Sequence, residues 1–184
     1  PFGRDAEMHD SSFGWRFVNN KMKDLYGTDA MGQTAENLVD KFGISREDQD
    51  QFSAWSQQKA AAAQKSGRLA EEIVAVEIPQ RKKDPIVFSQ DEFIRPGTTV
   101  ESLAGLRPAF RREGGTVTAG NASGLNDGAA ATIIASEDAV KKYNLKPLAR
   151  IVSSAVVGVE PRIMGIGPVG ATNLALKRAG LTLD

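Results

Sequence analysis

Residues 116–130 constrain the fold of this chain more than any other part of its sequence. They read TVTAGNASGLNDGAA, in which small and β-branched apolar residues enclose a loop rich in glycine, asparagine and serine. The pattern predicts buried strands at 116–119 and 129–135, joined by a tight loop. Glycines in such a loop let a ligand approach the backbone. A crossover between core strands with no ligand accounts for the composition equally well.

The sequence before this stretch predicts a mostly helical region. Its elements are marked by apolar residues at helical spacing, by an S-x-x-D capping pattern at Ser45, and by alternation of apolar and polar residues. We expect helices at 34–42, 45–65 and 98–105, short strands at 74–78 and 86–88, and a basic turn at 81–83. Residues 1–30 show neither period and are expected to form an irregular packed segment.

The sequence after the turn at Gly114 alternates between strand and helix patterns. Beyond the two strands named above, we expect a helix at 137–143, a buried strand at 151–157, and a helix that Pro168 opens and that ends at Ala179. This alternation predicts an α/β arrangement for the second part of the chain. The predicted fold class is therefore α/β, with a mostly helical first region and a boundary near Gly114.

Composition argues against several kinds of site. The 184 residues include no cysteine and a single histidine, His9, so the sequence holds no disulfide, no thiolate nucleophile and no thiolate metal site. The 23 basic and 23 acidic residues balance, which disfavours binding to nucleic acid or to a membrane surface. No apolar run approaches the roughly 20 residues that span a bilayer. We expect a soluble, cytoplasmic protein with no metal site.

Three short motifs have weaker functional interpretations. Residues 165–170, GIGPVG, match the dinucleotide-binding pattern G-x-G-x-x-G, but the expected strand ends too far upstream for the tight turn of such a site. The basic turn at 81–83 can hold a phosphate, although most runs of this kind are solvated surface. Asn121 begins a glycosylation sequon without any secretory context. We discard the sequon and favour a structural role for the other two motifs.

The 116–130 segment is similar to the signature of the thiolase family at the return from its loop domain to its amino-terminal core domain. Three further segments agree with the family in order and spacing: MGQTAEN at 31–37, SREDQD at 45–50 and RIMGIGP at 162–168. Together they extend the resemblance over essentially the whole chain. FGWRFVN at 13–19 and PRIMGIGPV at 161–169 resemble more specifically the 3-oxoadipyl-CoA thiolases of aromatic-compound breakdown.

The resemblance implies a thiolase-fold fragment with three parts. Residues 1–114 match the mostly helical loop domain, which binds coenzyme A. Residues 115–146 match the returning strand and helix of the amino-terminal core domain, and residues 147–184 match the start of the carboxy-terminal core domain. These incomplete α/β core layers would expose strand edges, so we expect pairing between chains or a larger molecule. The family also implies a homo-oligomer, a dimer or a tetramer.

The resemblance also implies where substrate binds. In the family, the pantetheine of acyl-CoA passes beside positions that match Arg95, Ser102, Leu106, Phe110, Ala119 and Ser123, and the acyl end lies near positions that match Met31 and Met164. A guanidinium can meet the nucleotide or its phosphates, a hydroxyl can bond pantetheine amides, and apolar side chains can form walls. The expected ligands are acyl-CoA and CoA, with coenzyme A as a substrate and no cofactor.

The catalytic groups of the family have no counterpart in this sequence. A thiolase cleaves 3-oxoacyl-CoA with CoA to acetyl-CoA and a shortened acyl-CoA. It needs a nucleophilic cysteine, an activating histidine, a second cysteine as acid and base, and an Asn-Glu-Ala-Phe loop. We expect the first cysteine upstream of Pro1 and the other groups after Asp184, so the chain is predicted to be an inactive interior fragment. A thiolase-like acyl-CoA or lipid carrier without chemistry is the alternative.

A further difference bears on the branch of the family. Ala30 stands where acetoacetyl-CoA thiolases often carry a histidine, directly before the residue that matches Met31. The substitution removes a group that can hold a water molecule. It argues against the acetoacetyl-CoA branch and agrees with the resemblance to 3-oxoadipyl-CoA thiolases.

Overall fold

The computed structural model describes residues 3–4, 8, 10 and 14–183, so His9 and Phe13 lie outside the described residues. Two compact units divide the chain. One is Val39–Ser123, called here the 39–123 unit, and the other joins Pro1–Leu38 to Gly124–Asp184 and is called the split unit. The domain boundaries expected between residues 114 and 115 and between residues 146 and 147 stay predictions.

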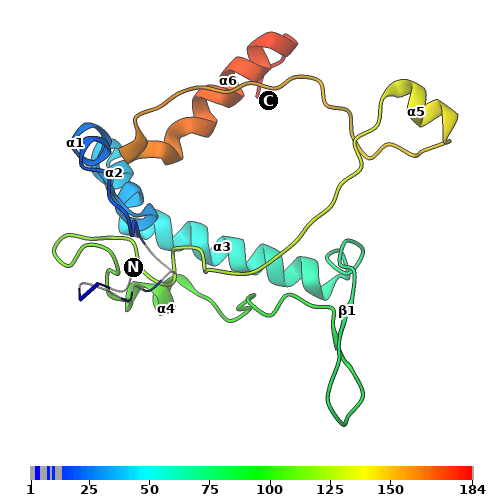
Figure 1. Ribbon diagram of the computed structural model, residues 1–184, viewed down its shortest axis with the longest axis horizontal. Helices are drawn as coiled ribbons and strands as arrows, with labels where there is room; N and C mark the ends of the chain where they lie inside the picture. The colour runs from blue at the N-terminus through cyan, green and yellow to red at the C-terminus, as the bar shows by residue number, and fades with distance from the viewer. Residues whose placement is uncertain (1–2, 5–7, 9, 11–13, 184) are drawn as a thin grey trace. The chain divides into compact units, whose positions relative to one another are not determined.

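The helices of the 39–123 unit form where the sequence predicts them. The longer one, α3 (Arg46–Lys65), is drawn in cyan in Figure 1. The Ser45 side chain accepts a hydrogen bond from the backbone N–H of Asp48, as the S-x-x-D pattern predicts, and acidic residues in the first turn oppose the helix dipole. The short helix α4 (Val100–Ala104) begins in a capping box and packs against α3.

A two-stranded antiparallel hairpin completes the regular structure of this unit. It consists of β1 (Val76–Ile78) and β2 (Ile86–Phe88), and it pairs Val76 with Phe88. β1 starts later than the predicted residue 74, whereas β2 has the predicted limits and 81–83 form the expected bend between the strands. Every residue of both strands is exposed, so backbone hydrogen bonds hold the hairpin together without a core of its own.

The core of the 39–123 unit is small. Its buried apolar side chains are Ala54 on α3, Leu103 on α4, and Val117, each 5% exposed or less. The backbone N–H of Ala109 donates to the carbonyl of Val117, and the next residue along, Thr118, forms an isolated antiparallel bridge with Pro108. Residues 117–118 are therefore paired with residues 108–109, and Val117 belongs to the core.

The split unit contains helices separated by long extended segments. Its elements are α1 (Asn20–Tyr26), the first residues of α2 (Met31–Phe42), α5 (Glu137–Lys142), the 3-10 segment η1 (Pro161–Ile166) and α6 (Gly167–Ala179). Helices α2, α5 and α6 were predicted, with α2 starting at Met31 and not at Thr34. At the other end of α2, Gly43 adopts a φ of 65°, which favours glycine, as the prediction of a helix end requires.

The expectation of an irregular packed segment at 1–30 is wrong on two counts. The helix α1 forms there because the Asn19 side chain accepts a hydrogen bond from the backbone N–H of Met22, a capping interaction that needs no apolar period. Between residues 14 and 19, directly before this helix, the chain is irregular but not packed, since Trp15 is 53% exposed and Phe17 92%.

Three predicted strands do not form within the described residues. Residues 116–119 contribute only the bridge at Thr118, although Val117 and Thr118 are buried as expected. Residues 129–135 and 151–157 are coil on either side of α5 (Figure 1), and their apolar side chains are exposed, Ile134 by 80% and Val156 by 89%. A strand needs hydrogen bonds to a neighbouring strand, and the only sheet in the described part of the chain is the β1–β2 hairpin.

The described part of the chain is therefore helical with a small sheet. The α/β alternation after residue 114 survives in its helices but not in its strands. None of the helices described combines the length and the apolar character that crossing a bilayer requires.

Candidate functional site

Asp50 on α3 is a buried carboxylate that joins two distant segments of the 39–123 unit. Only 2% of its side chain is exposed. Its Oδ2 accepts a hydrogen bond from Arg46 Nε at 2.7 Å, and its Oδ1 accepts one from Asn121 Nδ2 at 3.0 Å. Burying a charge is costly unless it is paired and hydrogen-bonded, and each oxygen of Asp50 meets that condition.

Arg46 extends this network to the end of α4. Its Nη2 donates to the backbone carbonyl of Leu103 at 2.7 Å and to that of Leu106 at 3.1 Å. Carbonyls in and after the last turn of a helix lack partners within the helix, so they need a donor from elsewhere. A guanidinium carries several donors in a fixed plane, which lets one side chain bind Asp50 and the end of α4 together.

Asn121 fixes the segment from 116 to 121 against the same carboxylate. Its Nδ2 donates to Asp50 and to the carbonyl of Thr116, and its Oδ1 accepts from the backbone N–H of Thr118 at 2.7 Å. The fully buried Thr118 hydroxyl oxygen accepts from the backbone N–H groups of Gly120 at 3.2 Å and Asn121 at 3.3 Å. Internal bonding of the loop amides explains its asparagine and threonine content.

Gly120 allows this loop to contact the end of α4. A Cβ atom at this position would lie 2.5 Å from Leu103 Cδ2 and 2.5 Å from Leu106 Cδ1, distances that real Cβ atoms do not show. Glycine therefore permits a close approach of backbone to side chain that any other residue would disturb. The loop and α4 are in direct contact at this point.

The two segments in contact carry four of the residues expected to bind coenzyme A. Ser102 and Leu106 come from α4 and its end, Ala119 and Ser123 come from the loop, and all four are exposed. The Ser102 hydroxyl donates to the carbonyl of Thr99 at 2.7 Å and accepts from the N–H of Thr99 at 3.1 Å. The proton of this hydroxyl is thus engaged, and the group can offer a ligand one remaining lone pair as an acceptor.

Arg95 and Phe110 lie in the same unit, and the backbone of Arg95 is held by a hydrogen bond. The N–H of Arg95 donates to Gln57 Oε1 on α3 at 2.8 Å, and its guanidinium lies 5.9 Å from the centre of the Phe93 ring. The Arg95 side chain is exposed, whereas Phe110 is half-buried next to Ala109. Arg95 therefore presents its charge to solvent from a fixed backbone position, as a residue that meets phosphates must.

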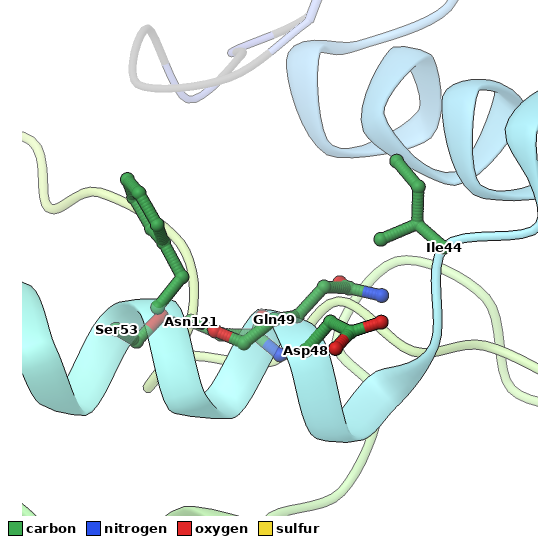
Figure 2. A pocket seen from close by; sticks show the side chains of 6 residues that line it. Ile44, Asp48, Gln49, Ser53 and Asn121 are labelled. Carbon is green, nitrogen blue, oxygen red and sulfur yellow. Dashed lines mark hydrogen bonds between the residues drawn. The ribbon is translucent and has the colours of Figure 1, made fainter.

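A hollow of about 310 Å³ opens beside the Asp50 network. Its lining consists of Ile44, Asp48, Gln49, Phe52, Ser53 and Asn121. Figure 2 shows Gln49 and Asn121 together along α3, with Ile44 on the segment that precedes this helix. None of the residues expected to bind coenzyme A lines the hollow, so it is not the site predicted from the sequence.

The remaining predicted residues, Met31 and Met164, belong to the split unit. Met31 is the first residue of α2 and is 72% exposed, and Met164 lies in η1 and is 49% exposed. A Cβ atom at Gly165 would lie 2.7 Å from Leu38 Cδ1, so η1 lies closely on α2. The segments that carry the two methionines are therefore packed together.

A polar cluster of Asp29, Asn37 and Arg162 fixes this packing. Asn37 Nδ2 donates to the carbonyl of Arg162 at 2.9 Å and to Asp29 Oδ2 at 2.8 Å, and Arg162 Nε donates to the same oxygen at 3.0 Å. The hydrogen bond from Asn37, and next that from Arg162, hold the pKa of the Asp29 carboxyl below its ordinary value. The lowered pKa keeps the Asp29 carboxyl ionised at neutral pH, and the cluster links residues from two of the motifs named above.

A second carboxyl group with a lowered pKa, that of Asp40, lies in the 39–123 unit. Arg111 donates to both oxygens of Asp40, at 2.8 Å and 3.1 Å, and these hydrogen bonds lower the pKa of Asp40. The pair is partly exposed, with 59% of the Asp40 side chain and 34% of the Arg111 side chain open to solvent. Within the described residues, no group of three or more histidine, cysteine or acidic side chains is arranged to hold a metal ion.

Sequence reasoning found the segments of this site but not the residues that join them. Arg46 and Asp50 lie within the motif SREDQD at the spacing of one helical turn, which is a signal for an ion pair. The carbonyls that Arg46 also binds are 57 and 60 positions away, and no spacing pattern in the sequence points to them.

Two family models match the sequence, one described as "Thiolase, N-terminal domain" over residues 4–138 and one as "Thiolase, C-terminal domain" over residues 145–184. The beta-ketoadipyl-CoA thiolase of Acinetobacter baylyi is 56% identical over 183 residues. The 3-oxoadipyl-CoA/3-oxo-5,6-dehydrosuberyl-CoA thiolase of Escherichia coli is 55% identical over 182 residues. These matches cover 100% and 99% of this chain but 45% of each relative, so the chain spans about half the length of the curated relatives it matches.

Solved structures agree with this assignment over the part that the chain covers. The acetyl-CoA acetyltransferase of Bacillus anthracis superposes with a TM-score of 0.83 at 42% identity, over 99% of this chain and 45% of that one. Human mitochondrial 3-ketoacyl-CoA thiolase in complex with CoA gives a TM-score of 0.77 at 52% identity, over 85% of this chain and 38% of that one. The predicted fold class is confirmed for the part of the fold that the chain spans.

Proposed function

Since the chain belongs to the thiolase family, we propose that it forms the coenzyme A-binding portion of an acyltransferase that cleaves 3-oxoacyl-CoA. In the proposed reaction the bond between C2 and C3 of the substrate breaks, C2 takes a proton, and acetyl-CoA leaves. The shortened acyl group is held as a thioester on an enzyme cysteine and then passes to the sulfur of free CoA. This chain has no cysteine, so its part in the reaction is to hold the substrate.

The contact between the end of α4 and the 116–121 loop carries this proposal. Gly120 brings the loop against Leu103 and Leu106, and the Asp50 network fixes both segments to α3. Pantetheine is a long, narrow chain with amide groups, which suits an exposed wall of apolar and small side chains with a few fixed polar atoms. Leu106, Ala119 and Ser123 supply the wall, and the acceptor lone pair of Ser102 supplies a partner for an amide N–H.

We propose 3-oxoadipyl-CoA as the acyl substrate. Two relatives at 55% identity or more are named for 3-oxoadipyl-CoA, or beta-ketoadipyl-CoA, which is the same compound. The test compares kcat/KM for 3-oxoadipyl-CoA and acetoacetyl-CoA in the longest polypeptide that the gene encodes. A higher value for 3-oxoadipyl-CoA is expected, and a higher value for acetoacetyl-CoA would overturn the choice of substrate.

Binding of coenzyme A by this chain has its own test. We expect isothermal titration of the chain to detect CoA weakly and Ser123→Trp to abolish the signal, because an indole at this exposed loop position fills the proposed passage. Ser89→Trp places the same indole on an exposed position after the hairpin and serves as the matched control. The proposed site is wrong if both variants bind as the wild type does, or if both lose binding equally.

Catalysis by this chain alone is not expected. Incubation of the chain with 3-oxoadipyl-CoA or acetoacetyl-CoA and free CoA should leave the thioester intact, since no cysteine is present to accept the acyl group. Measurable formation of acetyl-CoA would contradict the proposal that this chain holds the substrate and performs no chemistry.

A thiolase-like carrier without chemistry is the second candidate, and the absence of cysteine from these 184 residues is expected for it and for the enzyme alike. In that case the protein binds acyl-CoA or another lipid and performs no chemistry. The flanking sequence of the gene separates the two candidates: a cysteine before this chain together with a histidine after it supports the enzyme, and the absence of both supports the carrier.

We also propose that the protein forms a homo-oligomer. The segments 129–135 and 151–157 expose apolar side chains along extended backbone, a surface that another strand can cover. Light scattering of the longest gene product tests this, and a monodisperse monomer would count against it.

A further inference from the structure

Asp50 is placed to control the shape of the proposed coenzyme A wall without touching the ligand. One of its oxygens accepts a hydrogen bond from Arg46, which also donates to the carbonyl of Leu106. The other oxygen accepts from Asn121, which belongs to the loop. The wall residues that follow these contacts are exposed, whereas the Asp50 side chain is 2% exposed. A buried charge therefore links the end of α4 to the loop, which are also joined by the pairing of residues 108–109 with 117–118.

We propose that Asp50 is a positioning residue that holds the end of α4 and the 116–121 loop in register for coenzyme A. The inference rests on the proposed function, because it takes these two segments as the wall of the pantetheine passage. Loss of the carboxylate charge weakens the bond to Arg46 and the bond to Asn121 at once, so each segment loses its link to Asp50 while the pairing of residues 108–109 with 117–118 remains. Neither segment carries a group that reacts.

A shift of this wall has a particular kinetic signature. The wall contacts pantetheine equally in the ground state and in the transition state, so its loss raises KM and leaves kcat unchanged. A substrate that lacks most of pantetheine does not use the wall. The N-acetylcysteamine thioester of the same acyl group ends after a single amide, and its KM should not respond to the change.

The experiment measures both thioesters in the longest polypeptide that the gene encodes. Asp50→Asn keeps the size of the side chain but places an amide NH₂ where one donor, Arg46 Nε or Asn121 Nδ2, needs an acceptor. Glu72→Gln is the matched control, since Glu72 pairs with Arg68 at the same separation of four residues in the same unit but is exposed. If Asp50→Asn does not fold, Asn121→Ala replaces it, because this variant keeps the bond between Asp50 and Arg46 while it removes the bond to Asp50 together with the bonds of Asn121 to Thr116 and Thr118.

The expected result is a rise of about tenfold in KM for the CoA thioester with kcat within about twofold of wild type, and an unchanged KM for the short thioester. Glu72→Gln should match the wild type with both substrates. A merely structural role would lower activity equally with both thioesters, and that outcome would overturn the proposal, as would a fall in kcat alone or no change at all. A wild-type protein that neither binds CoA nor cleaves either thioester would instead overturn the proposed function.

Hydrogen exchange gives a readout that does not depend on activity. The backbone N–H of Thr118 is bonded to Asn121 Oδ1, whose orientation Asp50 fixes through Nδ2 of the same side chain. In Asp50→Asn this amide should exchange faster than in Glu72→Gln, while amides in the middle of α3 keep their protection. An unchanged Thr118 rate would show that Asp50 does not hold the loop and would overturn the proposal.

Discussion

The 39–123 unit and the segment from 124 to 160 of the split unit show two different ways in which a chain satisfies its backbone. In the first, α3 and α4 contain their own hydrogen bonds, and side chains such as Asp50 link segments far apart in sequence. In the second, extended residues on either side of α5 carry apolar side chains into solvent, including Ile133 at 89% exposure. Helical structure is complete within one segment, whereas a strand is complete only beside another.

This difference bears on where the free energy of folding resides. Buried side chains in the 39–123 unit are few, so each contributes a large share of its stability. Side chains at 129–135 and 151–157 bury little within this chain and contribute correspondingly little to its stability. Substitutions should therefore have large effects in the first region and small effects in the second.

The largest effect should come from removing the Asp50 carboxylate. Asp50→Ala leaves the charge of Arg46 and the amide of Asn121 without their shared acceptor in a buried place, which is expected to cost about 3–5 kcal/mol of unfolding free energy. Urea unfolding followed by the fluorescence of Trp55 on α3, in a Trp15→Phe background, measures the change. Glu72→Ala is the control and should shift the midpoint little, because the Arg68–Glu72 pair is exposed. If Asp50→Ala lost less than about 1 kcal/mol of unfolding free energy, contacts other than those of Asp50 would stabilise this unit.

The second prediction compares the two regions directly. Leu103→Ala removes a side chain that is 5% exposed and should cost about 2–5 kcal/mol, whereas Ile134→Ala removes one that is 80% exposed and should stay within about 0.5 kcal/mol. Urea unfolding followed by far-ultraviolet circular dichroism reports both. A cost for Ile134→Ala equal to that of Leu103→Ala would mean that residues 129–135 are packed in solution, by a second copy of the chain or otherwise.

The same contrast explains how much of the fold was predictable from sequence. Helices α3 and α6 were predicted closely, because the Ser45 cap, Pro168 and apolar spacing are all local signals. Apolar runs at 129–135 and 151–157 predicted buried strands, but these residues are coil with mostly exposed side chains, because a strand depends on a neighbour that no local pattern supplies. Helix α1 was missed because its signal is the single cap at Asn19.

The candidate site shows the same contrast between local sequence signals and contacts that are distant in sequence. The glycine-rich loop was recognised from its composition, and Gly120 lies where a Cβ atom would force the ends of two leucine side chains to shift. The identity of the contacting partners, Leu103 and Leu106, was not visible, because they lie far from the loop in sequence. The roles of Ser102 and Ser123 in binding coenzyme A stay predictions that come from the family resemblance.

A third prediction concerns the turn that leads into the loop. A Cβ atom at Gly115 would lie 2.1 Å from the backbone oxygen of Arg111, a clash that no side-chain rotation relieves. Gly115→Ala should therefore cost about 1–3 kcal/mol in urea unfolding. Gly97→Ala is the matched control, since nothing lies within 4 Å of a Cβ atom there, and it should be neutral or slightly stabilising. Equal losses of unfolding free energy at both positions would mean that the backbone at Gly115 leaves room for a Cβ atom beside the Arg111 oxygen.

The smallest expected effect is the pH dependence that Asp29 gives to the split unit. Hydrogen bonds from Asn37 and Arg162 hold the pKa of Asp29 below its ordinary value of 3.8, so the folded state favours the ionised carboxylate more than the unfolded chain does. The resulting stabilisation is fully present above pH of about 4, and it is lost as pH falls below that value through the lowered pKa. Because 54% of the Arg162 side chain is exposed, its size should stay below about 1 kcal/mol.

Urea unfolding of the wild type and of Asp29→Asn between pH 2 and pH 7, followed by the fluorescence of Trp15 in a Trp55→Phe background, measures this contribution. The wild type should be the more stable protein at neutral pH. The gap in unfolding free energy between the wild type and Asp29→Asn should narrow only as the pH falls below about 4. Asp24→Asn is the matched control, because Asp24 is an exposed acid on α1 in the same unit. A gap that stays constant down to pH 2 would mean that Asn37 and Arg162 bind the protonated carboxyl as well as the carboxylate, and that the packing of η1 on α2 does not depend on the Asp29 charge.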